Sequence, residues 1–456
     1  MTGGIVDFLP AKSPRRADQA VLPLPQHCLE TDEAARLIFR PDGRWGKAWI
    51  RFFRIPEHHA GRWLINLRVA ALFHDLGKAN ADFVAMTRGT HGLTQYFRHE
   101  HLSALVLQLP VVNAWLAANA ALDLGVLTGA VLSHHLKAGP SEPDKWCEPR
   151  RAGGLKVFLN HPDCARILAR VAEVANLEPP PLLPGGTLDR TLPDTEWNTA
   201  LGAGLRLAEE VRRGTGTGFG GKVATDPLRQ SLLLATKAGL VVADSVASGL
   251  FRVDESISAW VEAVVHAPPL SPRDVDREIL EPRAAELSAH SGRPFEWHRF
   301  QDLAAEQPSR ALLLASCGSG KTLAAYRWAK SQLASRPLGR VIFLYPTRGT
   351  ATEGFRDYVG HAPEDRAMLL HGSAAYELAG MQENPSDATA GKNYVDESAA
   401  RLFALGLWNR RYFSATVDQF LAFMEHRYES LCLLPALADA AVIIDEVHSF
   451  DSGHVP

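Results

Sequence analysis

The sequence has few cysteines, no excess of charge of one sign and no long uninterrupted apolar run. Its 456 residues include five cysteines, too scattered for a disulfide framework and without the CxxC spacing of a zinc cluster. Lys plus Arg is 48 and Asp plus Glu is 51, so the formal net charge of −3 excludes a globally basic nucleic-acid-binding protein. The apolar runs 120–132 and 431–444 are interrupted and too short to span a bilayer. Any nucleic-acid-binding surface must therefore be a local patch.

The remaining composition is that of a globular protein. Apolar residues make up 46% and charged residues 22%, and the length allows about three domains or two larger ones. The first residues, MTGGIVDFLPAKSPRR, lack an apolar core followed by a small-residue cleavage site, so we expect no signal peptide. Together with the sparse cysteines, this predicts a soluble protein in the reducing cytoplasm.

The sequence has two regions with different patterns of apolar residues, and they predict two kinds of fold. Between about residues 29 and 250, apolar residues recur every three to four positions, which indicates helices. The helical segments are 29–39, with Thr31 as its N-cap candidate, 63–78, 100–112, 124–136 and 228–251. Past about residue 285, short apolar runs alternate with helical stretches, which is typical of βαβ units around a parallel sheet. The predicted strands are 310–316, 340–347, 367–372, 411–416 and 440–446. We therefore predict a multidomain chain with an all-α domain over 1–250, a linker over 251–285 and an α/β domain over 286–456.

A glycine-rich turn in the second half predicts a nucleotide site. Residues 315–322 read ASCGSGKT, with Ala315 where the general pattern has glycine, and the backbone N–H groups of Gly318, Ser319 and Gly320 can cradle phosphates. Lys321 would reach the β and γ phosphates of ATP, and Thr322 would hold Mg²⁺.

Two carboxylates downstream support the same site. Asp445 and Glu446 end the apolar run VII, where Asp445 can coordinate Mg²⁺ through water and Glu446 can orient or deprotonate the attacking water.

The DEVH form and the surrounding order of motifs resemble superfamily 2 helicases and translocases. By this resemblance, Gln301 in the segment before the phosphate loop reads adenine. Thr347 and Arg348 end the next strand, and Thr416 lies in the following loop, where that family contacts the nucleic-acid backbone. These residues would supply the local phosphate-binding surface.

The same resemblance leads us to expect a fragment. Motors of this class hydrolyse ATP between two RecA-like lobes, and the second lobe supplies an arginine that is worth orders of magnitude in rate. The sequence stops at Pro456. We expect that the second lobe is missing, removed or carried on another chain, and that the motor is inactive with negligible DNA-stimulated ATPase activity.

A second constellation of histidines and aspartates predicts a metal centre in the helical half. His74 and Asp75 are adjacent within an apolar helix, and Lys78 follows one turn later, where it could neutralise a phosphate. Further candidates are His27, His99, His134, His135 and Asp244. Five imidazoles and two carboxylates suffice for two metal ions that share Asp75, and such a pair can clamp a phosphodiester and activate a water.

The order H…HD…H…HH…D resembles the HD phosphohydrolase superfamily. With HDLGK, RHExxS, SHH, ADSxAS, GSGKT and DEVH in sequence, nearly the whole chain resembles the type I CRISPR-associated HD nuclease–superfamily 2 helicases, as their HD domain plus first RecA-like lobe. The resemblance implies a nuclease for single-stranded DNA, an ATP-driven motor, and recruitment by a crRNA-guided surveillance complex. It further implies one metal on His27, His74, Asp75 and Asp244, and the other on Asp75, His99, His134 and His135. His74, Asp75, Lys78 and Glu446 would be catalytic.

The candidate ligands do not identify the metal, and the sequence is also compatible with two other functions. A mixed nitrogen and oxygen site favours Fe, Mn, Co or Ni over Mg. One alternative is an HD phosphohydrolase of nucleotides that the P-loop domain regulates. The other is a non-catalytic adaptor of a guide-RNA complex.

Overall fold

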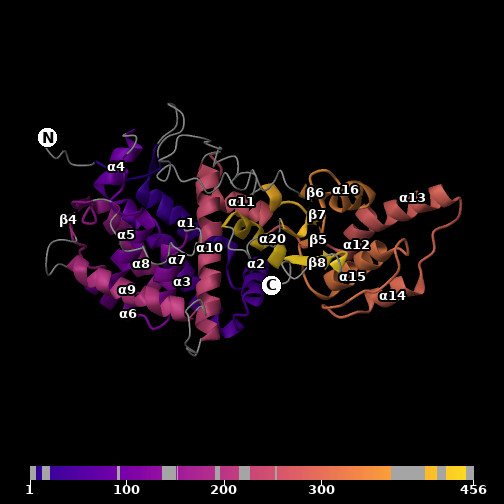
Figure 1. The fold of residues 1–456 in the computed structure, drawn as a ribbon, viewed down its shortest axis with the longest axis horizontal. Coiled ribbons are helices and arrows are strands. Elements are labelled where there is room, and N and C mark those ends of the chain that lie inside the picture. Colours follow the sequence, from indigo (N-terminus) through magenta and orange to yellow (C-terminus); the bar gives the residue numbers. More distant parts are fainter. Residues whose placement is uncertain are drawn as a thin grey trace. The chain divides into compact units, whose positions relative to one another are not determined.

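The computed structural model describes residues 7–12, 21–89, 93–135, 150, 152–189, 196–214, 226–251, 254–370, 406–418 and 428–447. These residues fall into two compact units (Figure 1), one up to Val261 and one from Glu262 onward. Each unit is described by itself.

The first unit is built from helices, as predicted. They are α1 (Leu24–Ile38), α2 (Arg44–Phe52), α3 (Ala60–Phe73), α4 (Ala81–Thr87), α5 (His99–Gln108), α6 (Pro110–Ala117), α7 (Leu124–Leu132), α8 (Pro162–Ala175), α9 (Glu196–Gly214) and α10 (Pro227–Phe251), with short turns η1 (Glu57–His59) and η2 (Leu76–Lys78). Helix α11 (Ile257–Val264) includes the boundary between the units. Two short antiparallel pairs add to them, β1 (Pro10–Lys12) with β2 (Leu22–Pro23) and β3 (Leu155–Val157) with β4 (Gly186–Leu188).

The long helix α10 forms the centre of this unit and packs against α1, α3 and α7. Among the described residues it is the one helix long and apolar enough to cross a membrane, and 83% of its most apolar window is buried inside the protein. A core helix meets the same criterion, and the burial of Val241, Val242 and Val246 shows that α10 serves as one here.

The helix boundaries differ from the predicted ones for local reasons. Helix α1 begins at Leu24 with Pro25 in its first turn, and Thr31 is not the N-cap but lies inside the helix, where its hydroxyl donates to the His27 carbonyl (2.8 Å). The predicted segment 63–78 is helical only to Phe73 and then turns. The segment 100–112 is split by Pro110, because proline cannot continue a helix but can start the next one.

A buried carboxylate ties three helices together. Asp32 of α1 is 1% exposed, and its oxygens accept from Arg68 of α3 (2.7 and 3.0 Å) and from Arg170 of α8 (3.0 Å). A buried charge is tolerated only when it is paired in this way. The pairs fix α1 against α3, which carry the first residues of the candidate metal centre.

The second unit contains a four-stranded sheet, and its parallel arrangement confirms the prediction. The strands β5 (Arg340–Tyr345), β6 (Ala367–Leu370), β7 (Tyr412–Thr416) and β8 (Ala440–Ile444) are ordered β6-β7-β5-β8, with every pair parallel. The surrounding helices are α12 (Pro272–Val275), η4 (Asp276–Leu280), α13 (Glu281–Ser291), α14 (Arg299–Ala305), α15 (Lys321–Ser335), α16 (Arg348–Asp357), η5 (Val359–His361), η8 (Tyr428–Leu433) and α20 (Leu434–Ala438). The chain thus combines a helical domain with an α/β domain of the RecA-like P-loop type.

One predicted strand is wrong. Residues 311–316 form no regular secondary structure, and Leu312 and Leu314 are 74% and 84% exposed. An apolar run becomes a strand only when a neighbouring strand pairs with it, and among the described residues β8 pairs only with β5.

The predicted linker contains regular structure. Within 251–285 lie α11, α12 and η4, and Leu270, Val275 and Ile279 belong to the hydrophobic core of the second unit. The boundaries at 250 and 285 stay a prediction.

Gly77 permits the close approach of η2 to α5 in the first unit. A Cβ atom at Gly77 would lie 2.1 Å from the His99 carbonyl oxygen and 2.6 Å from the Ser103 backbone nitrogen. The Gly77 N–H also donates to the Ser103 hydroxyl (2.8 Å). Only glycine therefore lets the turn after Asp75 lie against the helix that carries His99.

We predict that Gly77→Ala lowers the free energy of unfolding by at least about 2 kcal/mol, because the added methyl group meets backbone atoms that cannot rotate away. The matched control is Gly61→Ala in α3, where nothing lies within 4 Å of an added Cβ. There we expect no loss, and a gain of up to about 1 kcal/mol from helix propensity. Urea unfolding followed by circular dichroism measures both, and equal stabilities for the two variants would contradict the prediction.

Candidate functional site

The candidate metal centre is organised around Asp75, which follows the end of α3. Helix α3 stops at Phe73, and the chain turns through His74 and Asp75 into η2. His74 is fully buried and Asp75 is 1% exposed. An imidazole and a carboxylate are thus placed side by side in the core of the first unit.

The two carboxylate oxygens of Asp75 face different histidines. Oδ2 lies 3.1 Å from His27 Nε2 and 3.3 Å from His74 Nε2. Oδ1 lies 3.2 Å from His99 Nε2 and 3.8 Å from His134 Nε2. This is the arrangement that a carboxylate needs in order to bridge two cations.

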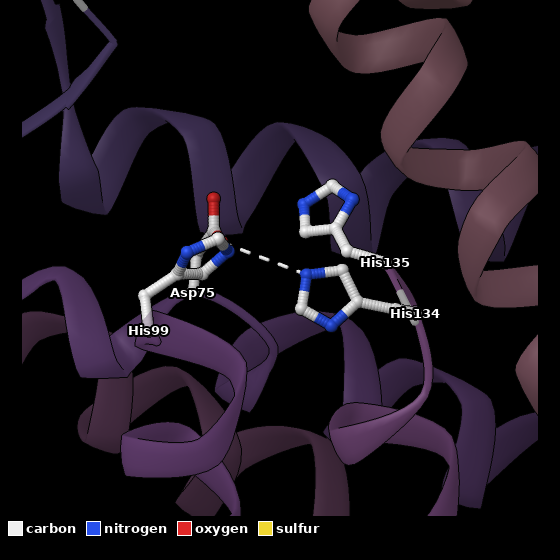
Figure 2. Close-up of side chains that lie close together, drawn as sticks. All are labelled: Asp75, His99, His134 and His135. Carbon is white, nitrogen blue, oxygen red and sulfur yellow. Dashed lines mark ion pairs between the residues drawn. The ribbon is translucent and has the colours of Figure 1, made fainter. Parts of the chain in front are cut away.

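The surrounding side chains form two groups. In the first, one ligand atom each from Asp75, His99, His134 and His135 lie within 4.8 Å of one another. Figure 2 shows the rings of His134 and His135 on one side and Asp75 with His99 on the other. In the second group, His27, His74 and Asp244 meet the same criterion, with Asp244 Oδ1 3.2 Å from His27 Nε2 and 4.0 Å from His74 Nε2.

Three helices, and the two turns that follow α3 and α7, carry these residues. His27 lies in the first turns of α1, His99 is the first residue of α5, and Asp244 lies within α10. His134 and His135 follow the end of α7, whose start is capped by Asp123 through the N–H groups of Gly125 and Val126. Residues more than two hundred positions apart thus converge because their helices pack in one core.

The donor atoms fit metal ions. Asp75 Oδ1 and the Nε2 atoms of His27, His74, His99 and His134 are buried and have no hydrogen-bond partner. Buried polar atoms without partners are costly, and native proteins rarely keep several of them together unless a ligand satisfies them. Imidazole nitrogens and carboxylate oxygens are ligands for divalent transition metals.

The electrostatics prepare the same groups for metal binding. Burial opposes the ionisation of Asp75, but the positive charges of His74 and Lys78 outweigh it and hold the pKa of Asp75 well below its usual range. Burial lowers the pKa of His134, and burial together with His134 and His99 lowers that of His135 strongly. An ionised carboxylate and neutral imidazoles are the forms that bind metals. His74 is the exception, because burial lowers its pKa but Asp75 outweighs this and raises it, so His74 must release a proton when a metal binds.

Lys78 lies beside Asp75. It is 5% exposed, and its ammonium donates to Asp75 Oδ2 (2.5 Å). It therefore stands next to the oxygen that faces His27 and His74, and its predicted role toward a phosphate stays a prediction.

The structure separates His99 from His101, two histidines of one motif. His99 faces Asp75, whereas His101 belongs to neither group of candidate metal ligands.

The residues that hold the candidate ligands in place were not identified from the sequence. Ser248 donates to Asp244 Oδ1 (2.9 Å) from one helical turn away, and Lys12 donates to Ser248 Oγ (2.5 Å). The spacing of Asp244 and Ser248 carries a signal for the first contact, but nothing local marks Lys12.

Glu100 was missed as well. It is fully buried, its Oε2 lies 3.3 Å from His99 Nδ1, and its Oε1 accepts from Arg98. Burial opposes its ionisation, but His99 and Arg98 outweigh it and lower the pKa of Glu100 to about 2.

In the second unit, the glycine-rich turn precedes α15 as predicted. Gly318 and Gly320 have φ angles of +75° and +88°, a conformation that favours glycine, and α15 begins at Lys321 and continues through Thr322. The Ser319 hydroxyl donates to the Ser316 carbonyl (2.7 Å). A turn of this kind at a helix start presents N–H groups to an anion.

The acidic pair lies at the same place. Lys321 Nζ lies 3.2 Å from Glu446 Oε1, which raises the pKa of Lys321. Asp445 follows the end of β8 and accepts from the Glu446 N–H (2.9 Å). The loop and the acidic motif are therefore adjacent in space, although 125 positions separate Lys321 and Glu446.

Gln301 contacts the loop directly. It is 1% exposed, its amide donates to the Gly320 carbonyl (3.1 Å), and its oxygen accepts from the His298 N–H (2.9 Å). Its contact with adenine stays a prediction.

The three predicted nucleic-acid contacts lie at the carboxyl ends of neighbouring strands. Thr347 and Arg348 follow β5, and Thr416 ends β7 in register with Tyr345. Thr347 caps α16 through the Thr350 N–H (3.2 Å), and Thr416 is 6% exposed. The structure brings them to one edge of the sheet, and their contact with DNA stays a prediction.

The helices of the first unit bring the residues of the H…HD…H…HH…D pattern together around the carboxylate of Asp75, which defines this unit as an HD-type domain. An HD-type domain implies binding of divalent metals. A P-loop domain follows it in the sequence. The family described as "Cas3, HD domain" matches residues 11–249, just over half of the chain. The chain belongs to the Cas3 family.

The chain is also similar to a curated protein and to solved structures. A "Putative CRISPR-associated nuclease/helicase Cas3" from Myxococcus xanthus (strain DK1622) is 33% identical over 390 residues, which is 84% of this chain and 48% of that protein. Among solved structures, "Crystal structure of T. fusca Cas3" is 18% identical, with a TM-score of 0.47, over 98% of this chain and 47% of that chain. A "CRISPR-associated protein" is 19% identical, with a TM-score of 0.46, over 97% of this chain and 49% of that chain. The chain spans about half the length of the curated relative it matches.

We predict that Asp75→Ala removes both metal ions, whereas Asp244→Ala removes only one, because Asp75 faces both histidine groups and Asp244 faces one. The measurement is elemental analysis of protein loaded with Mn²⁺ and passed over a desalting column. The parent chain should retain two ions, Asp244→Ala one and Asp75→Ala none. Retention of one ion by Asp75→Ala would mean that this carboxylate does not bridge.

Proposed function

We propose that this chain is a metal-dependent nuclease for single-stranded DNA, joined to the first lobe of an ATP-dependent DNA translocase. In this proposal it works in the cytoplasm in type I CRISPR interference, recruited by a crRNA-guided surveillance complex. Membership of the Cas3 family supports the proposal, since a relative in that family is described as a CRISPR-associated nuclease/helicase.

The single observation that carries the nuclease proposal is the position of Asp75 between two groups of ligands. Two divalent ions on these ligands would supply an activated water and neutralise charge on a phosphodiester. The chain's own residues hold the geometry: Asp75 fixes the spacing of the two groups, and the buried histidines keep their Nε2 atoms directed at it. Lys78 adds a positive charge at the same carboxylate and can pair with a phosphate oxygen of the bound strand.

The ligand set favours particular metals. Both groups combine imidazole nitrogens with carboxylate oxygens, which suits Fe, Mn, Co or Ni rather than Mg. We propose that the HD centre uses these metals and that Mg²⁺ accompanies ATP in the P-loop unit.

In the P-loop unit, the ion pair between Lys321 and Glu446 supports an ATP site. To bind ATP, Lys321 exchanges Glu446 for phosphate oxygens, which leaves Glu446 able to orient a water and Asp445 able to hold Mg²⁺ through water. Gln301 contacts the loop backbone and is placed to respond to the same ligand.

We predict that the chain cuts single-stranded DNA in Mn²⁺, Co²⁺, Ni²⁺ or Fe²⁺ without ATP, and that His74→Ala lowers the rate by more than about a hundredfold. The reason is that metal stabilisation of the transition state is worth several kcal/mol, and each ~1.4 kcal/mol is tenfold in rate. The matched control is His58→Ala, an exposed histidine outside both ligand groups, which should cut at the parent rate. Cleavage of a fluorescent oligonucleotide, followed on a gel, measures the rates of the parent chain, His74→Ala and His58→Ala.

The same assay separates the alternatives. Hydrolysis of nucleotides or cyclic nucleotides in preference to DNA would support a phosphohydrolase that the P-loop unit regulates. A chain that binds no metal and cuts nothing would support the adaptor. Equal cleavage by the parent and His74→Ala would contradict the nuclease proposal.

We predict that Lys321→Ala raises the dissociation constant for fluorescently labelled ATP at least about tenfold, because a charge-assisted hydrogen bond to phosphate is lost. Lys330→Ala is the control on the same helix, since Lys330 pairs with Asp276 (2.7 Å). Fluorescence anisotropy measures the affinities. A normal affinity in Lys321→Ala would show that the loop does not bind the phosphates.

A further inference from the structure

The histidines that face Asp75 differ in how their other ring nitrogen is held. His74 Nδ1 lies 2.7 Å from the Ala71 carbonyl and His134 Nδ1 lies 2.6 Å from the Val131 carbonyl. A carbonyl only accepts, so in both rings Nδ1 carries the proton and Nε2 keeps the lone pair that a metal requires. The tautomer of these two ligands is set by backbone atoms of their own helical turns.

His99 has a side-chain carboxylate in the corresponding place. Its Nδ1 lies 3.3 Å from Glu100 Oε2, and neither atom has a hydrogen-bond partner. One atom is a potential donor and the other a potential acceptor, so a small rotation of either side chain satisfies both. Among the residues that the structure describes, no backbone carbonyl accepts from His99 Nδ1.

Glu100 is held in the core at this position. It is the second residue of α5, fully buried, and its Oε1 accepts from Arg98 while Oε2 is directed at His99. An ion pair with Arg98 alone does not require Glu100 to be buried, because Arg98 is 19% exposed and could pair with a carboxylate at the surface. The burial of Glu100 Oε2 beside the imidazole of His99 therefore indicates a second role for Glu100, in addition to its ion pair with Arg98.

We propose that Glu100 is a positioning residue for the metal centre: it holds His99 through Nδ1 and makes Nε2 of that ring a stronger ligand. A carboxylate behind a ligating histidine fixes the ring and its tautomer and raises its basicity, and its loss lowers metal affinity about 10- to 100-fold. The inference rests on the proposed two-metal centre and deepens it.

The effect is confined to one of the two ligand groups. His99 belongs to the group with Asp75, His134 and His135, whereas His27, His74 and Asp244 form the other. The carboxylate of Asp244 in that other group is held by Ser248. Removing the charge of Glu100 should therefore weaken one metal ion and leave its neighbour bound.

The test is Glu100→Gln, which keeps the shape of the side chain and removes its charge. Metal-free protein is titrated with Mn²⁺, and electron paramagnetic resonance reports free Mn²⁺ and the spin-coupled pair. The parent chain should bind two ions. In Glu100→Gln we expect one dissociation constant to rise about 10- to 100-fold, the other to stay within about twofold, and the coupled signal to appear only at higher Mn²⁺. Glu100→Asp, which keeps the charge, should recover part of the affinity.

The matched control is Asp123→Asn. Asp123 is also a carboxylate paired with an arginine, Arg229 (2.9 Å), but it lies at the start of α7, eleven residues before His134. Asparagine can still cap the helix. Both Mn²⁺ affinities should equal those of the parent.

Each outcome bears on one claim. A parent chain that does not bind two Mn²⁺ ions contradicts the proposed function itself. If the parent binds two ions and Glu100→Gln binds them equally well, the positioning role is refuted. Loss of both ions together, with a lower unfolding temperature, would also overturn it, because Glu100 would then support the fold and not one ligand.

Discussion

The carboxylate of Asp75 is the constraint on which the first unit depends. Its two oxygens face His27 and His74 on one side and His99 and His134 on the other, and all five side chains are buried. The surrounding architecture serves this position. Helix α3 ends just before it, Gly77 lets α5 approach it, and α7 ends where its two histidines reach it. Several buried donor atoms without hydrogen-bond partners therefore lower the stability of the metal-free protein, and bound cations would offset this cost.

The polar atoms behind the ligands extend this arrangement. Backbone carbonyls hold the rings of His74 and His134, Glu100 lies against His99, and Ser248 holds Asp244. Lys12, from a short strand at the start of the described chain, reaches Ser248. Each contact restricts the orientation of one ligand, so the two groups are arranged before any ion arrives, which limits the ordering that binding requires. In the P-loop unit, an ion pair between Lys321 and Glu446 likewise restricts two side chains at the nucleotide loop, and the two charges neutralise each other.

Much of this could be predicted from the sequence because the strongest signals are local. Adjacent His74 and Asp75, the pair His134 and His135, and the GSGKT turn identify their chemistry without a structure. The strand expected over 310–316 was wrong because an apolar run does not specify its pairing partner, and the Thr31 cap was wrong because Pro25 starts the helix earlier. Glu100 and Lys12 could not be predicted, since a glutamate beside a histidine and a lysine 236 positions from its partner look like ordinary surface residues.

The central claim, that one carboxylate bridges two metal ions, is tested most directly by anomalous diffraction at the manganese edge from crystals soaked in Mn²⁺. The account predicts two anomalous peaks about 3.5–4 Å apart, with Asp75 between them, His99, His134 and His135 around one, and His27, His74 and Asp244 around the other. A single peak, or two peaks that do not share Asp75, would contradict it.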